Sequence, residues 1–263
     1  AVSAPAAVAL ADVVTYADAL LGVATTPDYA NALNGLQLAN GGRVRGIAAA
    51  VDFSRRSIDG AIAAQANLLV VHHGMFWSGA QPIRGAAWER LRRLIAGDVA
   101  VYAAHLPLDR HPTLGNNALL ARALGLEPTG EFARHESIFV GVRGECDEAT
   151  AALAARADAF ARQHGGVARV TPAARDRRTR RWAICTGAGA SADTLREARD
   201  SGIDTLVVGE GPHWTAVEAE ELGLVIVYAG HYATETLGVR ALAEHLSAAF
   251  GLPWSFVEAP TGL

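Results

Sequence analysis

The chain has 263 residues, 51% of them hydrophobic, which is enough for one large domain or two interlocked lobes with a sizeable core. Its formal net charge of −4 excludes a broad basic surface for nucleic acid, and the absence of lysine excludes P-loop, protein-kinase and Schiff-base mechanisms. Only Cys146 and Cys185 are present, so neither a disulfide framework nor a thiolate zinc site is expected, and a cytoplasmic setting is favoured.

The first half of the chain alternates predicted helices and strands. Residues 1–21 predict an amphipathic helix ended by Gly22. This segment carries Asp12 and Asp18 and lacks the basic start of an exported segment, so neither a transmembrane nor an exported segment is expected. Residues 28–37 predict a turn-rich loop that leads to an edge strand. Further strands are predicted at 46–51, 68–71 and 99–104, and further helices at 54–66, with Ser54 as N-cap, at 87–96 and at 114–124.

From residue 127 the pattern restarts. Residues 202–211 resemble residues 65–74, because in both a helix end precedes an apolar strand, polar residues and glycine. The arginine-rich run 175–181 is expected to form a solvated loop rather than a nucleic-acid patch. Strands are predicted at 138–142, 182–186, within 202–211, at 224–228 and at 254–257, and helices at 147–164, 191–200 and 235–250.

Alternating strands and helices predict an α/β fold with largely parallel sheets. The restart of the pattern at residue 127 makes two similar half-folds plausible.

His72 and His73 follow the apolar run 68–71 and precede Gly74. Side chains alternate along a strand, so adjacent histidines can reach one cavity only where the strand ends and the backbone turns. A pair of imidazoles placed in this way can bind a metal ion. The alternative is that both are hydrogen-bonded structural residues.

Two further segments offer ligands. His231 and Glu235 are four residues apart at the start of a predicted helix, so they share one face and can bind the same ion; alternatively, they only cap the helix. Asp109 lies in a proline-rich loop after a strand, where a turn-forming role is the alternative. All five residues lie at or beyond the carboxyl ends of predicted parallel strands, where sites gather in α/β sheets.

Three imidazoles and two carboxylates are too many ligands for one catalytic zinc and suit two ions bridged by a carboxylate. The mixed nitrogen and oxygen ligands are compatible with Zn, Mn, Fe, Co or Ni and do not choose among them. We therefore expect two divalent transition-metal ions per chain and a hydrolytic reaction.

The motifs His72-His73-Gly74-x-x-Trp77, His105-Leu106-Pro107-Leu108-Asp109, Gly209-Glu210 and Gly230-His231-Tyr232-x-Thr234-Glu235 together resemble the NIF-three-like family of dinuclear metal proteins, also called GTP cyclohydrolase 1 type 2-like. The chain is similar to the short bacterial form. The resemblance implies that His72 and His73 ligate different ions, that Asp109 and His231 each complete one, and that Glu235 bridges both. It also implies a toroidal homohexamer and two interlinked α/β lobes. We expect residues 1–126 with 225–263 to form the metal-binding lobe and residues 127–224 to form the second lobe.

Other polar residues have weaker assignments. His105 and Glu210 are candidate catalytic residues. Alternatively, His105 is a hydrogen-bond donor behind a ligand and Glu210 has a hydrogen-bonded role in its loop. His111 shares that alternative, and His213 lies in Gly211-Pro212-His213-Trp214, where the chain departs from the usual family pattern. Trp77 and Arg84 are candidates for a wall of the site and an anion clamp, with a core position as the alternative for Trp77.

These observations lead to a metal-dependent hydrolase that acts by metal-activated water on a small nucleotide-like or phosphorylated substrate, with GTP cyclohydrolase activity implied by resemblance only. One alternative is a hexameric metal-binding scaffold or metal-handling protein without turnover. Another is a phosphoesterase acting on nucleotides or nucleic acid, although neither nucleic acid nor membrane is an expected partner.

Overall fold

The computed structural model describes residues 6–263, which form two compact units. The first unit contains the chain as far as Leu108 together with Gly238–Ala259, and the second contains Asp109–Leu237 with Pro260–Leu263. The chain therefore forms most of the first unit, then the second unit, and returns to the first unit at Gly238. The expected divisions were at 126/127 and 224/225, whereas the structure divides the chain at 108/109 and 237/238.

The first unit is built on a five-stranded sheet. Four strands are parallel neighbours and the edge strand β2 is antiparallel, so the expected α/β class is confirmed and the sheet is largely parallel. Residues 68–71 are buried without alternation, as expected for a strand covered on both faces. In spatial order the strands are β13 (Trp254–Phe256), β4 (Ile47–Asp52), β5 (Leu68–His73), β6 (Ala100–Ala103) and β2 (Gly35–Leu38).

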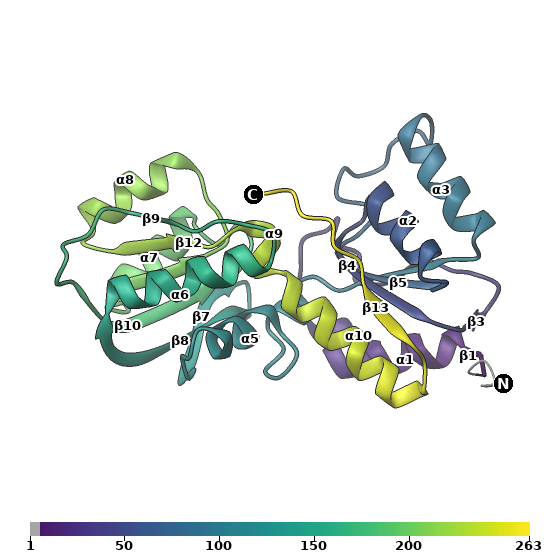
Figure 1. The fold of residues 1–263 in the computed structure, drawn as a ribbon, viewed down its shortest axis with the longest axis horizontal. Coiled ribbons are helices and arrows are strands. Elements are labelled where there is room, and N and C mark those ends of the chain that lie inside the picture. Colours follow the sequence, from purple (N-terminus) through teal and green to yellow (C-terminus); the bar gives the residue numbers. More distant parts are fainter. Residues whose placement is uncertain (1–5) are drawn as a thin grey trace. The chain divides into compact units, whose positions relative to one another are not determined.

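Helices cover both faces of this sheet (Figure 1). On one face lie α2 (Arg55–Ala63) and α3 (Ala86–Ala96), whose Ile58 and Leu94 pack with Leu69 in the core. The predicted N-cap Ser54 accepts a hydrogen bond from the backbone of Ser57 and starts α2. On the other face lie α1 (Leu10–Leu21) and α10 (Thr236–Phe250), joined where Tyr16 stacks on His245.

The second unit has a six-stranded mixed sheet. Its centre, β10, β11 and β12, is parallel, and β7, β8 and β9 add antiparallel strands. In spatial order the strands are β7 (Gly130–His135), β8 (Ile138–Ala149), β10 (Arg178–Cys185), β11 (Thr205–Val208), β12 (Val225–Tyr228) and β9 (Arg169–Val170).

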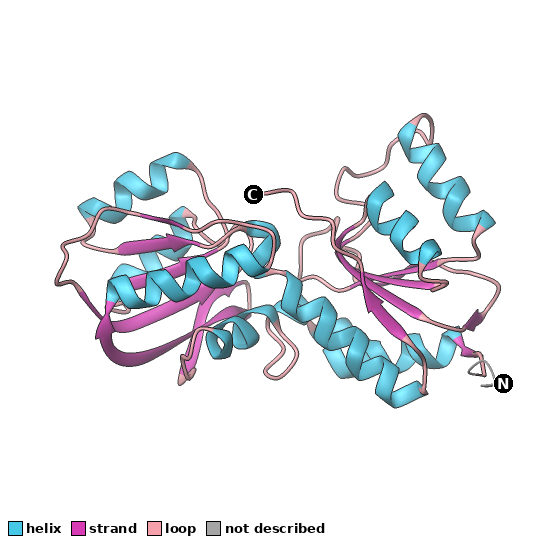
Figure 2. Cartoon of the chain, in the orientation of Figure 1, coloured by secondary structure: helices cyan, strands magenta, loops and turns pink. Residues whose placement is uncertain are grey.

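This sheet also lies between two helical layers (Figure 2). On one face α5 (Asn116–Ala123) and α6 (Thr150–Gln163) bury Leu120 and Leu153 against Trp182. On the other face lie α7 (Ala192–Asp200) and α8 (His213–Glu221). The packing of α5 on this core, and the pairing of β12 with β11, explain why residues 109–126 and 225–237 belong to the second unit.

The N-terminal helix is shorter than expected. The predicted range was 1–21, of which residues 1–5 lie outside the described part of the chain. Val8–Ala9 form β1, paired with β3 (Arg43–Val44), so α1 begins at Leu10, and a 3-10 turn, Val23–Thr25, follows its end. None of the helices among residues 6–263 is both long and apolar enough to cross a membrane.

The arginine-rich run is only partly a loop, because β10 begins at Arg178, and the expectation of a loop through residue 181 was wrong. Its side chains have local partners: Arg177 donates to the carbonyl oxygens of Asp204 and Gly223, and Arg178 pairs with Asp147 at 2.6 Å. Arg177 and Arg178 are therefore engaged within the protein, although a nucleic-acid patch would need their charges free to bind phosphate.

Candidate metal centre

His72 ends the buried part of β5. Its side chain is fully buried, and its Nδ1 lies 2.7 Å from the carbonyl oxygen of Ala104, just past β6. A carbonyl oxygen only accepts, so Nδ1 is the donor and carries the proton. In the neutral imidazole the lone pair is then on Nε2, the atom through which a histidine held in this way binds a metal.

His73 is held in the same manner by a carboxylate. Its Nδ1 lies 2.7 Å from Oδ1 of Asp52, the last residue of β4, which the parallel β4–β5 register places opposite His73. The rings of His72 and His73 have centroids 4.8 Å apart. Adjacent strand residues therefore lie side by side at the strand end, as the sequence predicted.

Gly74, which follows the two histidines, lies close to the side chain of Gln37. A Cβ at Gly74 would lie 2.2 Å from Oε1 of Gln37, and the same oxygen accepts the backbone N–H of Met75 at 2.7 Å. A larger residue at position 74 would force the side chain of Gln37, which comes from β2, to move.

His105 follows β6 and joins the same cluster. Ligand atoms of His72, His73 and His105 lie within 4.8 Å of one another. Nδ1 of His105 is 2.9 Å from Oδ1 of Asp28. Although burial raises the pKa of Asp28, hydrogen bonds from His105, Asn34 and Leu106 lower it overall, so this carboxylate stays ionised behind the imidazole.

The second unit holds a matching arrangement at α9 (His231–Thr234). Nδ1 of His231 is 2.6 Å from Oε1 of Glu210, and Nε2 is 3.1 Å from Oε2 of Glu235. Burial alone lowers the pKa of His231, but the two carboxylates raise it to about 9. Without a metal ion, His231 is thus a cation between two anions, and its proton must leave before Nε2 can ligate.

Asp109, at the end of α4 (Leu106–Asp109), lies close to Glu235: their ligand oxygens are within 4.8 Å of each other. Both carboxylates are buried, and Oδ1 of Asp109 accepts a hydrogen bond from Asn116 at 2.8 Å. Two buried carboxylates so close together repel each other unless a proton or a cation lies between them. This pair of oxygen donors therefore fits a divalent ion.

One feature is common to the four histidines, in that each hydrogen-bonds an oxygen through Nδ1. The partners are a backbone carbonyl for His72 and the carboxylates of Asp52, Asp28 and Glu210 for the others. Such partners fix the tautomer and ring orientation of metal-ligating histidines. With the carboxylates of Asp109 and Glu235, the donors are nitrogen and oxygen atoms that suit Zn, Mn, Fe, Co or Ni, so the residues present fit the implied ions.

The remaining candidates differ in their surroundings. Trp77 lies beside the histidines, with its ring centroid 4.7 Å from that of His105. Arg84 and His213 are exposed. Nδ1 of His111 accepts the backbone N–H of Leu114 at 3.0 Å and so supports its own loop.

Sequence reasoning missed Asp28, Asp52 and Gly187. Asp28 was placed only in the turn-rich loop 28–37, and Asp52 was given no role in the site. Gly187, in Thr186-Gly187-Ala188-Gly189 after β10, has φ +65°, and a Cβ there would lie 2.2 Å from Oε1 of Glu235. The glycine-rich strand end was the available signal for this residue.

The role of Asp52 gives a first prediction. Asp52→Asn keeps an acceptor for Nδ1 of His73 but removes the negative charge behind the ring, so we expect metal affinity to fall about tenfold. Competition with a chromogenic chelator measures this. The matched control is Asp59→Asn, a half-exposed carboxylate of α2 paired with Arg93, and equal losses in both variants would contradict the assignment.

Comparisons with known proteins agree with one another. The profile of the family described as Duf34/NIF3 (NGG1p interacting factor 3) matches residues 8–261. A Halobacterium salinarum protein named GTP cyclohydrolase 1 type 2 homolog is 43% identical over 243 residues, covering 90% of this chain and 93% of its own. A protein of the same name from Deinococcus radiodurans is 41% identical over 234 residues, covering 88% and 86%. The crystal structure of TTHA1606 from Thermus thermophilus matches with TM-score 0.85 and 36% identity, covering 97% of this chain and all of that one.

Proposed function

This chain belongs to the Duf34/NIF3 family, and from that premise we propose that it is a dinuclear metal-dependent hydrolase acting on a small nucleotide-like or phosphorylated substrate. His72, His73, Asp109, His231 and Glu235 would hold the two ions, with Glu235 shared between them. The observation that carries the proposal is the common anchoring of the histidines through Nδ1, which directs Nε2 to be the ligand.

Each residue then has a distinct task. Asp52 and Glu210 hold the rings of His73 and His231 in one orientation and keep a proton on Nδ1, which leaves Nε2 as the ligating atom once His231 has lost its second proton. Glu235 lies between Asp109 and His231 within its unit, which supports its assignment as the shared carboxylate. When bound, the ions would lower the pKa of a water molecule and stabilise negative charge that develops on the substrate.

His105 is the chain's own candidate for moving a proton. Asp28 holds its Nδ1, so Nε2 is available as an acceptor in the neutral form. The His105–Asp28 pair thereby has the composition of a general base with an orienting carboxylate. Trp77 packs edge-on against this ring and limits its rotation.

The relatives named GTP cyclohydrolase 1 type 2 homolog make GTP a natural first substrate to test. The metal-loaded protein is expected to turn over at least one compound in a panel of nucleoside triphosphates, cyclic nucleotides and phosphate monoesters. Release of formate and of phosphate would be followed separately, and removal of the metal should stop the reaction.

The competing function is a scaffold or metal-handling protein without turnover. It predicts tight metal binding with no product from any member of the panel. Loss of the assembled oligomer on metal removal, measured by light scattering, would favour this function over a hydrolase. Under the hydrolase proposal, assembly and turnover respond separately to Asp28→Asn, which leaves the metal ligands in place.

A further inference from the structure

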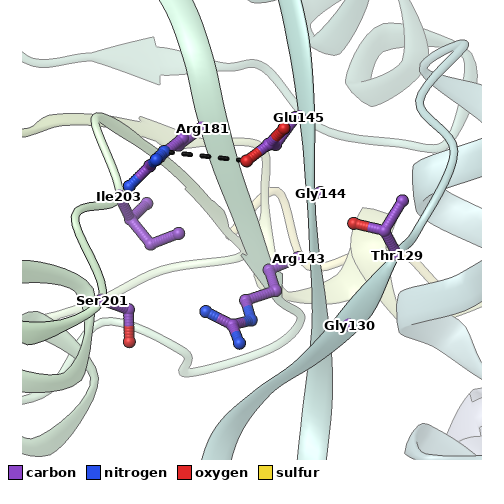
Figure 3. Close-up of a pocket in the computed structure, with 8 residues that line it drawn as sticks. All are labelled: Thr129, Gly130, Arg143, Gly144, Glu145, Arg181, Ser201 and Ile203. Carbon is purple, nitrogen blue, oxygen red and sulfur yellow. Dashed lines mark ion pairs between the residues drawn. The ribbon is translucent and has the colours of Figure 1, made fainter.

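A polar cleft lies in the second unit, where β8 and β10 meet the loop after α7 (Figure 3). Its volume is about 280 Å³, and its lining includes Arg143, Arg181, Glu145, Ser201 and Thr129. None of these residues belongs to the candidate metal centre. The cleft therefore requires a separate explanation.

Strand register explains why two arginines share the cleft. In the antiparallel β8–β10 pair, Glu145 lies opposite Arg181 and Arg143 lies opposite Ala183. Because alternate residues of a strand point to one face, Arg143, Glu145 and Arg181 project from the same side of the sheet. Figure 3 shows the guanidinium of Arg143 extending towards Ser201.

Glycines leave room for both guanidinium groups. A Cβ at Gly130 would lie 3.0 Å from Nε of Arg143, and a Cβ at Gly202 would lie 3.0 Å from Nη1 of Arg181. An added Cβ at either position would make the flexible arginine side chain shift slightly, and the φ of +68° at Gly202 favours glycine there in any case. Each arginine side chain therefore passes close to a glycine of the cleft.

Positive charge remains uncompensated in the cleft. Arg181 has one ion pair here, with Glu145 at 3.8 Å, and both side chains are more than half exposed, so the pair contributes little. Among the eight residues that line the cleft, no carboxylate is paired with Arg143 (Figure 3). Two guanidiniums facing one carboxylate leave a net charge of one positive.

A purely structural role for Arg143 would be to cap the carboxyl end of α7. The last carbonyls of that helix already have backbone donors, because Glu197 accepts from Ser201, Ala198 from Ile203 and Arg199 from Gly202. Arg143 is therefore not needed to satisfy the helix end.

We propose that this cleft binds the phosphate group of a small molecule, either inorganic phosphate or a phosphate monoester. The planar fork of Arg143 suits two oxygens of a phosphate, and Arg181 can exchange its exposed partner Glu145 for a third. The hydroxyls of Ser201 and Thr129 add neutral donors at the rim. The volume admits a phosphate with a sugar-sized body.

Calorimetric titration of the metal-loaded protein with inorganic phosphate and with ribose 5-phosphate tests this site, with sodium chloride at matched ionic strength as the blank. Arg143→Gln is expected to weaken phosphate binding at least about tenfold. The matched control is Arg180→Gln, which removes the exposed neighbour of Arg181 on β10 that pairs with Asp147 at 3.8 Å, and this variant should bind as the parent does.

The outcomes separate the alternatives. Phosphate binding that survives Arg143→Gln would locate it elsewhere, including at the metal ions, and would overturn the proposal. Equal weakening by Arg180→Gln would reduce the effect to general charge and overturn it as well. If the site is as proposed, tighter binding of ribose 5-phosphate identifies a monoester ligand, and equal binding identifies free phosphate. Thermal melts establish that each variant is folded.

Discussion

Purified without chelator, the protein is expected to contain about two divalent transition-metal ions per chain, and the variant His72→Ala with Glu235→Ala is expected to lose nearly all of them. His72 is the most buried of the candidate imidazoles, and Glu235 is the carboxylate that lies near both Asp109 and His231. Removing one nitrogen donor and the shared oxygen donor leaves each ion short of ligands. Elemental analysis by mass spectrometry measures the result.

The matched control removes the same residue types elsewhere. His213→Ala with Glu218→Ala deletes an exposed histidine and an exposed glutamate from α8 and should retain the metal. Protein that is metal-free as purified and takes up neither added Mn nor added Zn would refute the metal centre and the hydrolase together. Metal retained in the His72, Glu235 variant would refute the ligand assignment alone.

Four of the candidate ligands could be picked out from the sequence because they stand in local patterns. An apolar run that ends in two histidines, and a His and a Glu four residues apart at a helix start, can be recognised within ten residues of sequence. The parallel sheet and most helices followed from the same periodicities. Ser54 was identified as an N-cap from its place before an apolar-periodic segment, and it is one.

The supporting residues were not predictable in this way, because tertiary pairing defines their roles. Asp52 meets His73 only through the β4–β5 register, and Asp28 meets His105 across 77 residues of chain. The boundaries between the two units could not be predicted for a similar reason. The apolar face of α5 can pack on either sheet, and only the assembled core of Leu120, Leu153 and Trp182 shows which one it covers.

Gly187→Ala is expected to lower metal affinity about a hundredfold while leaving the second unit folded. The backbone of Gly187 is held from two sides: its N–H donates to Oγ1 of Thr234, and its carbonyl accepts from the N–H of Glu210. An added Cβ would lie 2.2 Å from Oε1 of Glu235 and 3.2 Å from Nε2 of His231. Because the backbone is tied, the flexible carboxylate of Glu235 must move, and the ligand geometry is lost.

The backbone angle of Gly187 adds a separate cost that the control must match. At φ +65° an alanine is strained by about 1 kcal/mol wherever it occurs. Gly223 has the same φ of +65°, and a Cβ added there would have no atom within 4 Å, so Gly223→Ala carries the strain without the collision. Both variants should therefore melt at similarly reduced temperatures, whereas only Gly187→Ala should lose metal. Equal metal affinity in the two would mean that Glu235 does not need the position that Gly187 leaves open, and its assignment as the shared carboxylate would fail.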